Sequence, residues 1–164
     1  MKCRECVSKR RNHFIYTGVK FSSHHGLNRH VVINWNSPQF EEWPHLLKLS
    51  SELAKLSSGR IGKYIRCLGM GKQSRTPHIH YLLTEDGEAQ LELRARAQLW
   101  MKHFFSSCVP DPEGLLSYFF DRNFIPTFDD RERPRGIRVL SASRGMPCGY
   151  PSVSKSPLNF GSLK

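Results

Sequence analysis

Long hydrophobic runs are missing from this chain of 164 residues, and a helix needs about 20 mostly apolar residues to cross a bilayer. We therefore expect no membrane contact. A secretory signal is not expected either, because the basic residues near the N-terminus are followed by no apolar segment. The five cysteines are an odd number. Without a secretory signal, this count argues against a disulfide framework and favours a reducing compartment.

Acidic residues are also scarce, with 14 Asp and Glu against 25 Lys and Arg and a net charge of +11. The excess is confined to the two ends of the chain. Residues 1–20 hold six cations against one Glu, and residues 131–164 hold seven against one Glu. The middle is therefore neutral. Two basic ends on a neutral body are typical of a protein that binds the phosphates of a nucleic acid, although charged and merely soluble termini would look the same.

One domain is expected over residues 1–135, with the basic, cysteine-bearing segment 1–20 included. A basic tail rich in Ser, Gly and Pro follows over residues 136–164. The candidate phosphate contacts lie near the two ends and in one Gly-bearing loop, and they are Arg10, Arg11, Lys72, Arg75, Arg135 and Arg144.

An α+β fold is expected from the order of the local patterns. Patterns typical of strands cover residues 14–20, 29–35, 61–68, 76–83 and 137–140. Helical spacing of apolar residues covers residues 45–57, 88–105 and 113–123. In the second of these segments the apolar side consists of Leu93, Ala97, Trp100 and Phe104. The sum predicts a central antiparallel sheet with helices packed on one side of it.

His78 and His80 stand one residue apart at the start of a predicted strand, after Pro77. Side chains alternate along a strand, so the two imidazoles share one face, roughly 7 Å apart at the backbone. Neutral imidazole is the commonest metal-binding side chain, and this spacing allows both rings to bind one ion. A pair of strand histidines with a purely structural role is the alternative.

Tyr118 lies beside the apolar face of the predicted helix 113–123, one turn before Arg122. A tyrosine at this place can reach a site on the sheet, and a neighbouring guanidinium favours its phenolate form. The ordinary alternative is a tyrosine at the rim of the core. A basic chain with a histidine pair and such a tyrosine predicts transesterification of a nucleic-acid phosphodiester. The metal ion would polarise the phosphate, and the tyrosine oxygen would attack phosphorus.

Cys3 and Cys6 have the spacing of half a zinc site, and a closed structural site needs four ligands. Free thiols are the alternative to a structural Zn²⁺ at this pair. The remaining ligands could come from a later cysteine or from histidines, and the candidates are Cys148, His13, His24 and His25.

These motifs resemble the HUH endonucleases, and within them the rolling-circle replication initiators of small single-stranded DNA phages and plasmids. Residues 29–35 resemble the strand of the first motif. Pro77 to His80 resemble the metal motif, and Tyr118 with Arg122 resembles the nucleophile motif. The segments Cys3 to Cys6 and Ser143-Arg144-Gly145 also resemble parts of related proteins.

The resemblance implies an HUH palm similar to an RRM fold, with His-x-His on a central strand. It implies a DNA nicking and joining enzyme that leaves a covalent 5′-phosphotyrosine, with Mg²⁺ or Mn²⁺ at His78 and His80. The substrate would be a single-stranded DNA origin, and host helicase and polymerase would be the partners in the bacterial cytoplasm. A monomer is expected.

Two positions differ from the family pattern. Gly69 stands where many relatives have a metal-binding Glu, so Gln73 or water would supply the third ligand. The cation after the nucleophile is Arg122 at +4, while +3 is Asp121. Two other functions fit the same residues, namely a single-tyrosine HUH transposase and a nucleic-acid-binding module without catalysis. A relaxase fits less well, because its nucleophile lies near the N-terminus, where only Tyr16 is available.

Overall fold

The computed structural model describes residues 4–35, 54–57, 60–70, 77–99, 101–124 and 140–146. Eight elements follow one another in these residues: α1 (Arg4–His25), β1 (Arg29–Trp35), β2 (Tyr64–Met70), β3 (Pro77–Leu83), α3 (Glu85–Arg96), β4 (Met101–Cys108), α4 (Glu113–Phe124) and β5 (Leu140–Ala142). Residues 54–57 form a helical turn. The rest of the helix expected over 45–57, and the domain boundary expected at residue 135, lie outside the described residues.

The five strands form one sheet in the order β4-β1-β3-β2-β5, and each neighbouring pair is antiparallel. The expected α+β class with an antiparallel sheet is therefore confirmed. β3, which carries His78 and His80, is the third strand in this order. Its two neighbours, β1 and β2, determine what surrounds those imidazoles.

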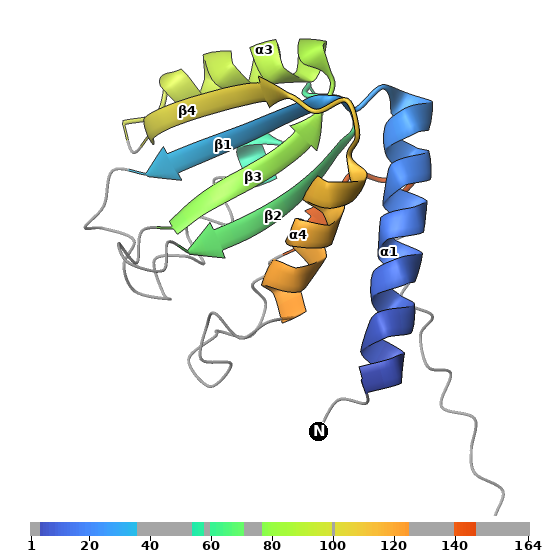
Figure 1. Cartoon of the computed structure of the whole chain (residues 1–164). Coiled ribbons are helices and arrows are strands. Elements are labelled where there is room, and N and C mark those ends of the chain that lie inside the picture. Colours follow the sequence, from blue (N-terminus) through green and yellow to red (C-terminus); the bar gives the residue numbers. More distant parts are fainter. Residues whose placement is uncertain are drawn as a thin grey trace, which may run out of the picture.

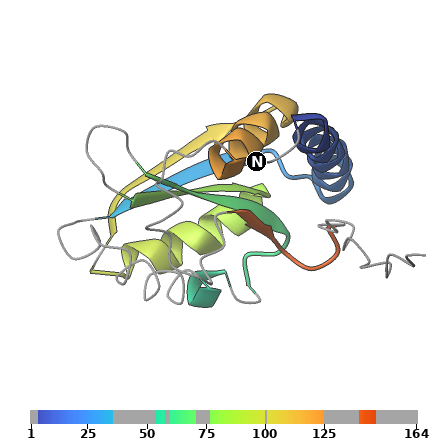
Figure 2. The same cartoon turned by 90° about the horizontal axis from the view of Figure 1, so that it is seen from below.

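Helices cover both faces of the sheet, so the prediction of helices on one side is wrong. In Figure 1 α4 and α1 lie side by side near β2, and in Figure 2 they lie on the opposite side of the sheet from α3. α4 packs against β2 and β5, while α3 packs against β1 and β4. Within the described residues, no helix is both long enough and apolar enough to cross a membrane.

The side chains of β3 alternate between two buried layers. Ile79, Tyr81 and Leu83 are buried on the face that α3 covers, and Leu82 is buried on the face that α4 covers. The helices complete these layers with the buried side chains of Leu91, Ala95, Leu116 and Phe119. Full burial of one such large side chain contributes about 1.5–3 kcal/mol. The sheet is therefore fixed from both sides, and α4 holds its place on the histidine face.

The strand expected over residues 14–20 is wrong, because these residues belong to α1. Buried or half-buried residues recur at positions 7, 11, 14, 18, 21 and 25, which is helical spacing. The β-branched residues Ile15, Thr17 and Val19 favour a strand by propensity alone. Packing against α4 overrides that preference, and the Thr17 hydroxyl donates to the His13 carbonyl (2.8 Å) inside the helix.

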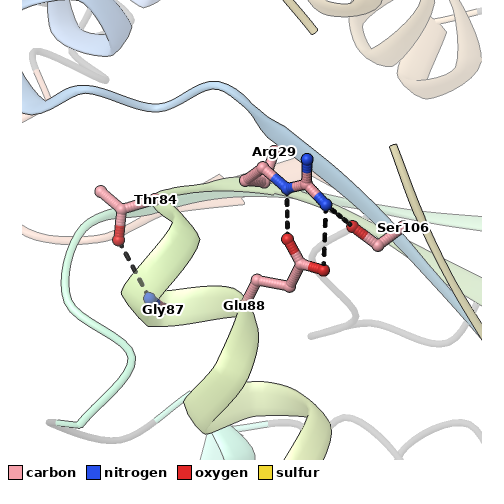
Figure 3. Close-up of polar contacts among 5 residues, drawn as sticks. All are labelled: Arg29, Thr84, Gly87, Glu88 and Ser106. Carbon is pink, nitrogen blue, oxygen red and sulfur yellow. Dashed lines mark hydrogen bonds and ion pairs between the residues drawn. The ribbon is translucent and has the colours of Figure 1, made fainter. Parts of the chain in front are cut away.

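The prediction of one helix over residues 88–105 is wrong after Arg96, where α3 ends. Thr84 caps α3 by accepting a hydrogen bond from the Gly87 N–H (3.0 Å), so the helix begins earlier than expected (Figure 3). After the helix, the Met101 N–H donates to the Gln98 carbonyl (3.2 Å) and the chain enters β4. Leu93 was expected on the buried side and is instead 70% exposed.

Arg29 joins β1, β4 and α3 on the face opposite to the histidines. Its Nε and Nη2 donate to the Glu88 carboxylate, and Nη2 also donates to Ser106 Oγ at 3.0 Å (Figure 3). The hydrogen bond from Arg29 lowers the pKa of Glu88, and the same bond raises the pKa of Arg29. The pair therefore fastens the start of α3 to the sheet.

We expect Glu88→Gln to destabilise the fold at neutral pH and not in acid. Because the pKa of Glu88 is lower in the folded chain than in the unfolded one, the stabilisation is fully present above the unfolded value of about 4.3. It is lost as the pH falls through the lower folded value. Urea unfolding at pH 7 and at pH 3 measures the difference. If Glu88→Gln lowers the free energy of unfolding equally at pH 7 and at pH 3, the expected pH dependence is contradicted.

Candidate functional site

The centre of the site is the pair His78 and His80 on β3. Both lie on the sheet face that α4 covers, and their ring centroids are 4.8 Å apart with planes at 81°. His80 is only 7% exposed, whereas His78 is half-buried. The two imidazoles predicted to share a face therefore lie next to one another, and one of them is partly exposed to solvent.

Tyr118 brings a phenol to this pair from α4. Its Oη lies 3.5 Å from His80 Nε2, and the two ring centroids are 5.3 Å apart with planes at 78°. The neighbours Phe119 and Phe120 are buried, while Tyr118 is half-buried at the edge of the apolar face of the helix. The predicted helix 113–123 corresponds to α4, which holds the tyrosine at the histidine pair.

His30 is a member of the site that sequence reasoning missed. Its Nε2 lies 3.0 Å from His80 Nδ1, and the two rings stack with centroids 5.3 Å apart and planes at 18°. Burial lowers the pKa of His30, which favours its neutral form. His80 thus contacts His30 through one ring nitrogen and Tyr118 through the other. The sequence does show a histidine at the start of the predicted strand 29–35, but which residue lies next to it depends on strand pairing.

Gly69 leaves the space that the His78 ring occupies. The two residues are paired between β2 and β3, and a Cβ atom at Gly69 would lie 2.5 Å from His78 Nε2. Any side chain at position 69 would therefore displace this imidazole. Many HUH endonucleases have a metal-binding Glu at the position that Gly69 resembles. In this chain the His78 ring occupies the space that the Cβ atom of such a Glu would need.

The donor set fits a divalent ion in part. His78 and His80 offer two imidazoles on one face, and a neutral His30 behind His80 adds no competing charge. Among the described residues, no group of three His, Cys, Asp or Glu is placed to hold a metal ion. Gln73, the predicted third ligand, lies outside them. Imidazole ligands favour ions such as Zn²⁺ and Ni²⁺, whereas Mn²⁺ and Mg²⁺ prefer oxygen ligands. The predicted Mn²⁺ or Mg²⁺ would therefore need water or phosphate oxygens in its remaining positions.

The predicted phosphate contacts have different surroundings. Arg11 donates to Asp121 Oδ1 (3.0 Å) and to Ser117 Oγ, so its guanidinium links α1 to α4. Arg10 and Arg144 are exposed, and Cys6, half of the predicted zinc pair, is exposed on α1. Arg122 belongs to α4, but its side chain is outside the described part. The other predicted residues outside that part are Cys3, Lys72, Arg75 and Arg135.

The site therefore consists of three imidazoles and one phenol from β1, β3 and α4, arranged as Tyr118, His80 and His30 in a row with His78 beside His80. Such a row places a potential nucleophile next to potential metal ligands. Comparison of the chain with models of protein families, with curated proteins and with solved structures gave no match in any of the three.

Proposed function

We propose that this protein is a metal-dependent DNA nicking and joining enzyme of the HUH type, with Tyr118 as its nucleophile. The observation that carries the proposal is the 3.5 Å separation of Tyr118 Oη from His80 Nε2, beside a second imidazole on the same strand face. The ring packing of Tyr118 would serve a structural tyrosine as well, but a nucleophile must in addition lie within reach of the group that activates the phosphate, and the Oη to Nε2 distance is consistent with that requirement.

The proposed reaction exchanges one phosphodiester for another. The Tyr118 oxygen attacks phosphorus, its proton passes to water, and the 3′-oxygen of the upstream nucleotide departs and takes up a proton. The products are a 5′-phosphotyrosine and a free 3′-hydroxyl, and the reverse attack by a 3′-hydroxyl rejoins the strand. A divalent ion held by His78 and His80 would polarise the phosphate and neutralise its developing charge.

His80 and His30 have separate tasks in this proposal. His80 Nδ1 lies 3.0 Å from His30 Nε2, and His80 Nε2 is the nitrogen nearest Tyr118. In this proposal the ion would bind on the Nε2 side of the ring. His30 orients the His80 ring, as hydrogen-bond partners of metal-binding histidines commonly do. Because burial lowers the pKa of His30, its neutral ring brings no positive charge next to the cation.

The biological role that suits this chemistry is initiation of rolling-circle replication. The single-stranded origin would be nicked, and the free 3′-hydroxyl would prime synthesis. A monomer in the cytoplasm of a bacterial host, working with host helicase and polymerase, completes the proposal. The net charge of +11 supports a polyanionic substrate.

The test is covalent capture of DNA on a denaturing gel. The protein is incubated with a single-stranded DNA pool and Mn²⁺, with the label at either the 3′ or the 5′ end. We expect a protein band that carries the 3′ label and not the 5′ label, because the downstream fragment stays attached to Tyr118. A chelator and the variant His78→Ala should each remove the band. If native gels show tight binding while no adduct forms with any pool, the protein is a nucleic-acid-binding module instead.

A further inference from the structure

Two aromatic rings lie uncovered on the same sheet face as the proposed site. Phe105 is 56% exposed on β4, and His103 two residues earlier is exposed as well. Their ring centroids are 5.7 Å apart with planes at 39°. Phe104, between them, points to the other face and lies under Arg96 of α3. Both exposed rings therefore belong to the face of β4 that carries the histidines.

Strand pairing connects these rings to the site in two parallel rows. Val32 on β1 pairs with His80 on one side and with Phe105 on the other. Asn34 pairs in the same way with His78 and His103. Each row thus runs across three strands, and its ends are separated by two strand spacings, about 10 Å. The aromatic pair continues the same surface as the histidine pair.

The helices of the described residues leave this half of the face open. α4 packs against β2 and β5, and α1 packs against α4, so both lie toward the far edge of the sheet from β4 (Figure 1). On the opposite face, α3 does cover β4. A single exposed apolar side chain is ordinary on a protein surface, so the feature of interest is the pair of adjacent rings, 5.7 Å apart between centroids.

We infer that Phe105 and His103 form a stacking platform for unpaired bases of the DNA strand whose phosphodiester is held at Tyr118. This inference rests on the proposed function. Single-stranded nucleic acid is the occupant that the chain favours, since its net charge of +11 attracts phosphates while flat rings stack on any base. The platform would hold the bases two strand spacings, about 10 Å, from the histidine pair and would bind with little sequence preference.

Equilibrium binding to two oligonucleotides of equal charge tests the platform. One is oligo-dT, and the other has the same length but lacks all bases, and both are measured without metal so that no nicking occurs. Phe105→Ala should weaken oligo-dT binding about tenfold, in the range found for loss of one stacked base, and leave the abasic oligonucleotide unaffected. Phe105→Trp should retain the affinity. The matched control is Leu93→Ala, which removes an exposed apolar side chain from α3 on the opposite face.

Photo-crosslinking of the unaltered chain provides a second measurement, independent of the folding of any variant. Oligo-dT that carries 5-iodouracil should crosslink to residues 101–108, as mapped by mass spectrometry. The platform would be overturned if Phe105→Ala weakened binding of both oligonucleotides equally. It would also be overturned if the crosslinks were confined to other elements. If the unaltered chain were a dimer and Phe105→Ala made it monomeric with unchanged DNA binding, the rings would be a contact between two copies of the chain and the platform would also be overturned. Failure of covalent capture with intact base-dependent binding would refute the nicking reaction alone.

Discussion

Tyr118→Phe is expected to lower the rate of covalent attachment to DNA about a thousandfold or more, while DNA affinity stays unchanged. Loss of the attacking oxygen removes the nucleophile itself, and catalytic groups of this kind typically account for rate factors of that size. The ring remains, so its packing against His80 and Phe119 is kept. The measurement is the yield of denaturation-resistant adduct over time, together with the dissociation constant for the same oligonucleotide.

The matched control for this experiment is Tyr16→Phe, which removes the same hydroxyl from an exposed tyrosine on α1. It should form adduct at the rate of the unaltered chain. Persistence of the adduct in Tyr118→Phe would show that another hydroxyl attacks, and peptide mapping of the adduct would identify it. Thermal unfolding of both variants should stay close to that of the unaltered chain, since surface and rim changes usually alter stability by about 0.5 kcal/mol or less.

Phe119→Ala is expected to lower the free energy of unfolding by about 3–5 kcal/mol, the range for removal of a buried phenyl ring. Phe119 is fully buried, and its ring lies 5.9 Å from the His80 ring and 6.3 Å from the His30 ring, measured between centroids. The cavity would thus open next to the imidazoles of His80 and His30. Urea unfolding followed by circular dichroism measures the loss.

Leu93→Ala serves as the comparison for Phe119→Ala, because Leu93 is also a large apolar residue on a helix but is 70% exposed. Its effect should stay within about 0.5 kcal/mol. A similar loss of stability in the two variants would mean that α4 does not pack on the sheet as described. Phe119→Leu, which keeps most of the apolar volume, should recover a large part of the stability.

Local patterns were sufficient for the parts of the fold where one face is buried and the other is not. The strand 29–35 is rich in β-branched residues and the helix 113–123 has helical periodicity, and β1 and α4 follow these ranges closely. β4 escaped prediction for a physical reason. Phe104 is covered by α3 while Phe105 is exposed on the open face, so two apolar neighbours remove the alternation that identifies a strand.

The residues of the candidate site likewise fall into those that local patterns predict and one that they do not. His78, His80 and Tyr118 could be chosen from spacing along single elements. His30 could not, because its contact with His80 arises from the antiparallel pairing of β1 with β3, in which Arg29 faces Leu83 and Val32 faces His80. Strand pairing depends on residues far apart in the sequence, and no local pattern encodes it. α1 illustrates the converse, since its β-branched residues gave a local signal that packing against α4 reversed.

The alternation of β1 also bears on how such a chain can diverge. His30, Val32 and Asn34 belong to the histidine face, whereas Val31 and Ile33 are fully buried beneath the other face. Deleting one residue near the start of β1 would exchange these two sets, placing an imidazole among apolar side chains and a valine beside His80. Substitutions along β1 can therefore accumulate one at a time. Insertions and deletions within it would remove the site and half of the core in a single event, so length variation among descendants should be confined to the connections between strands.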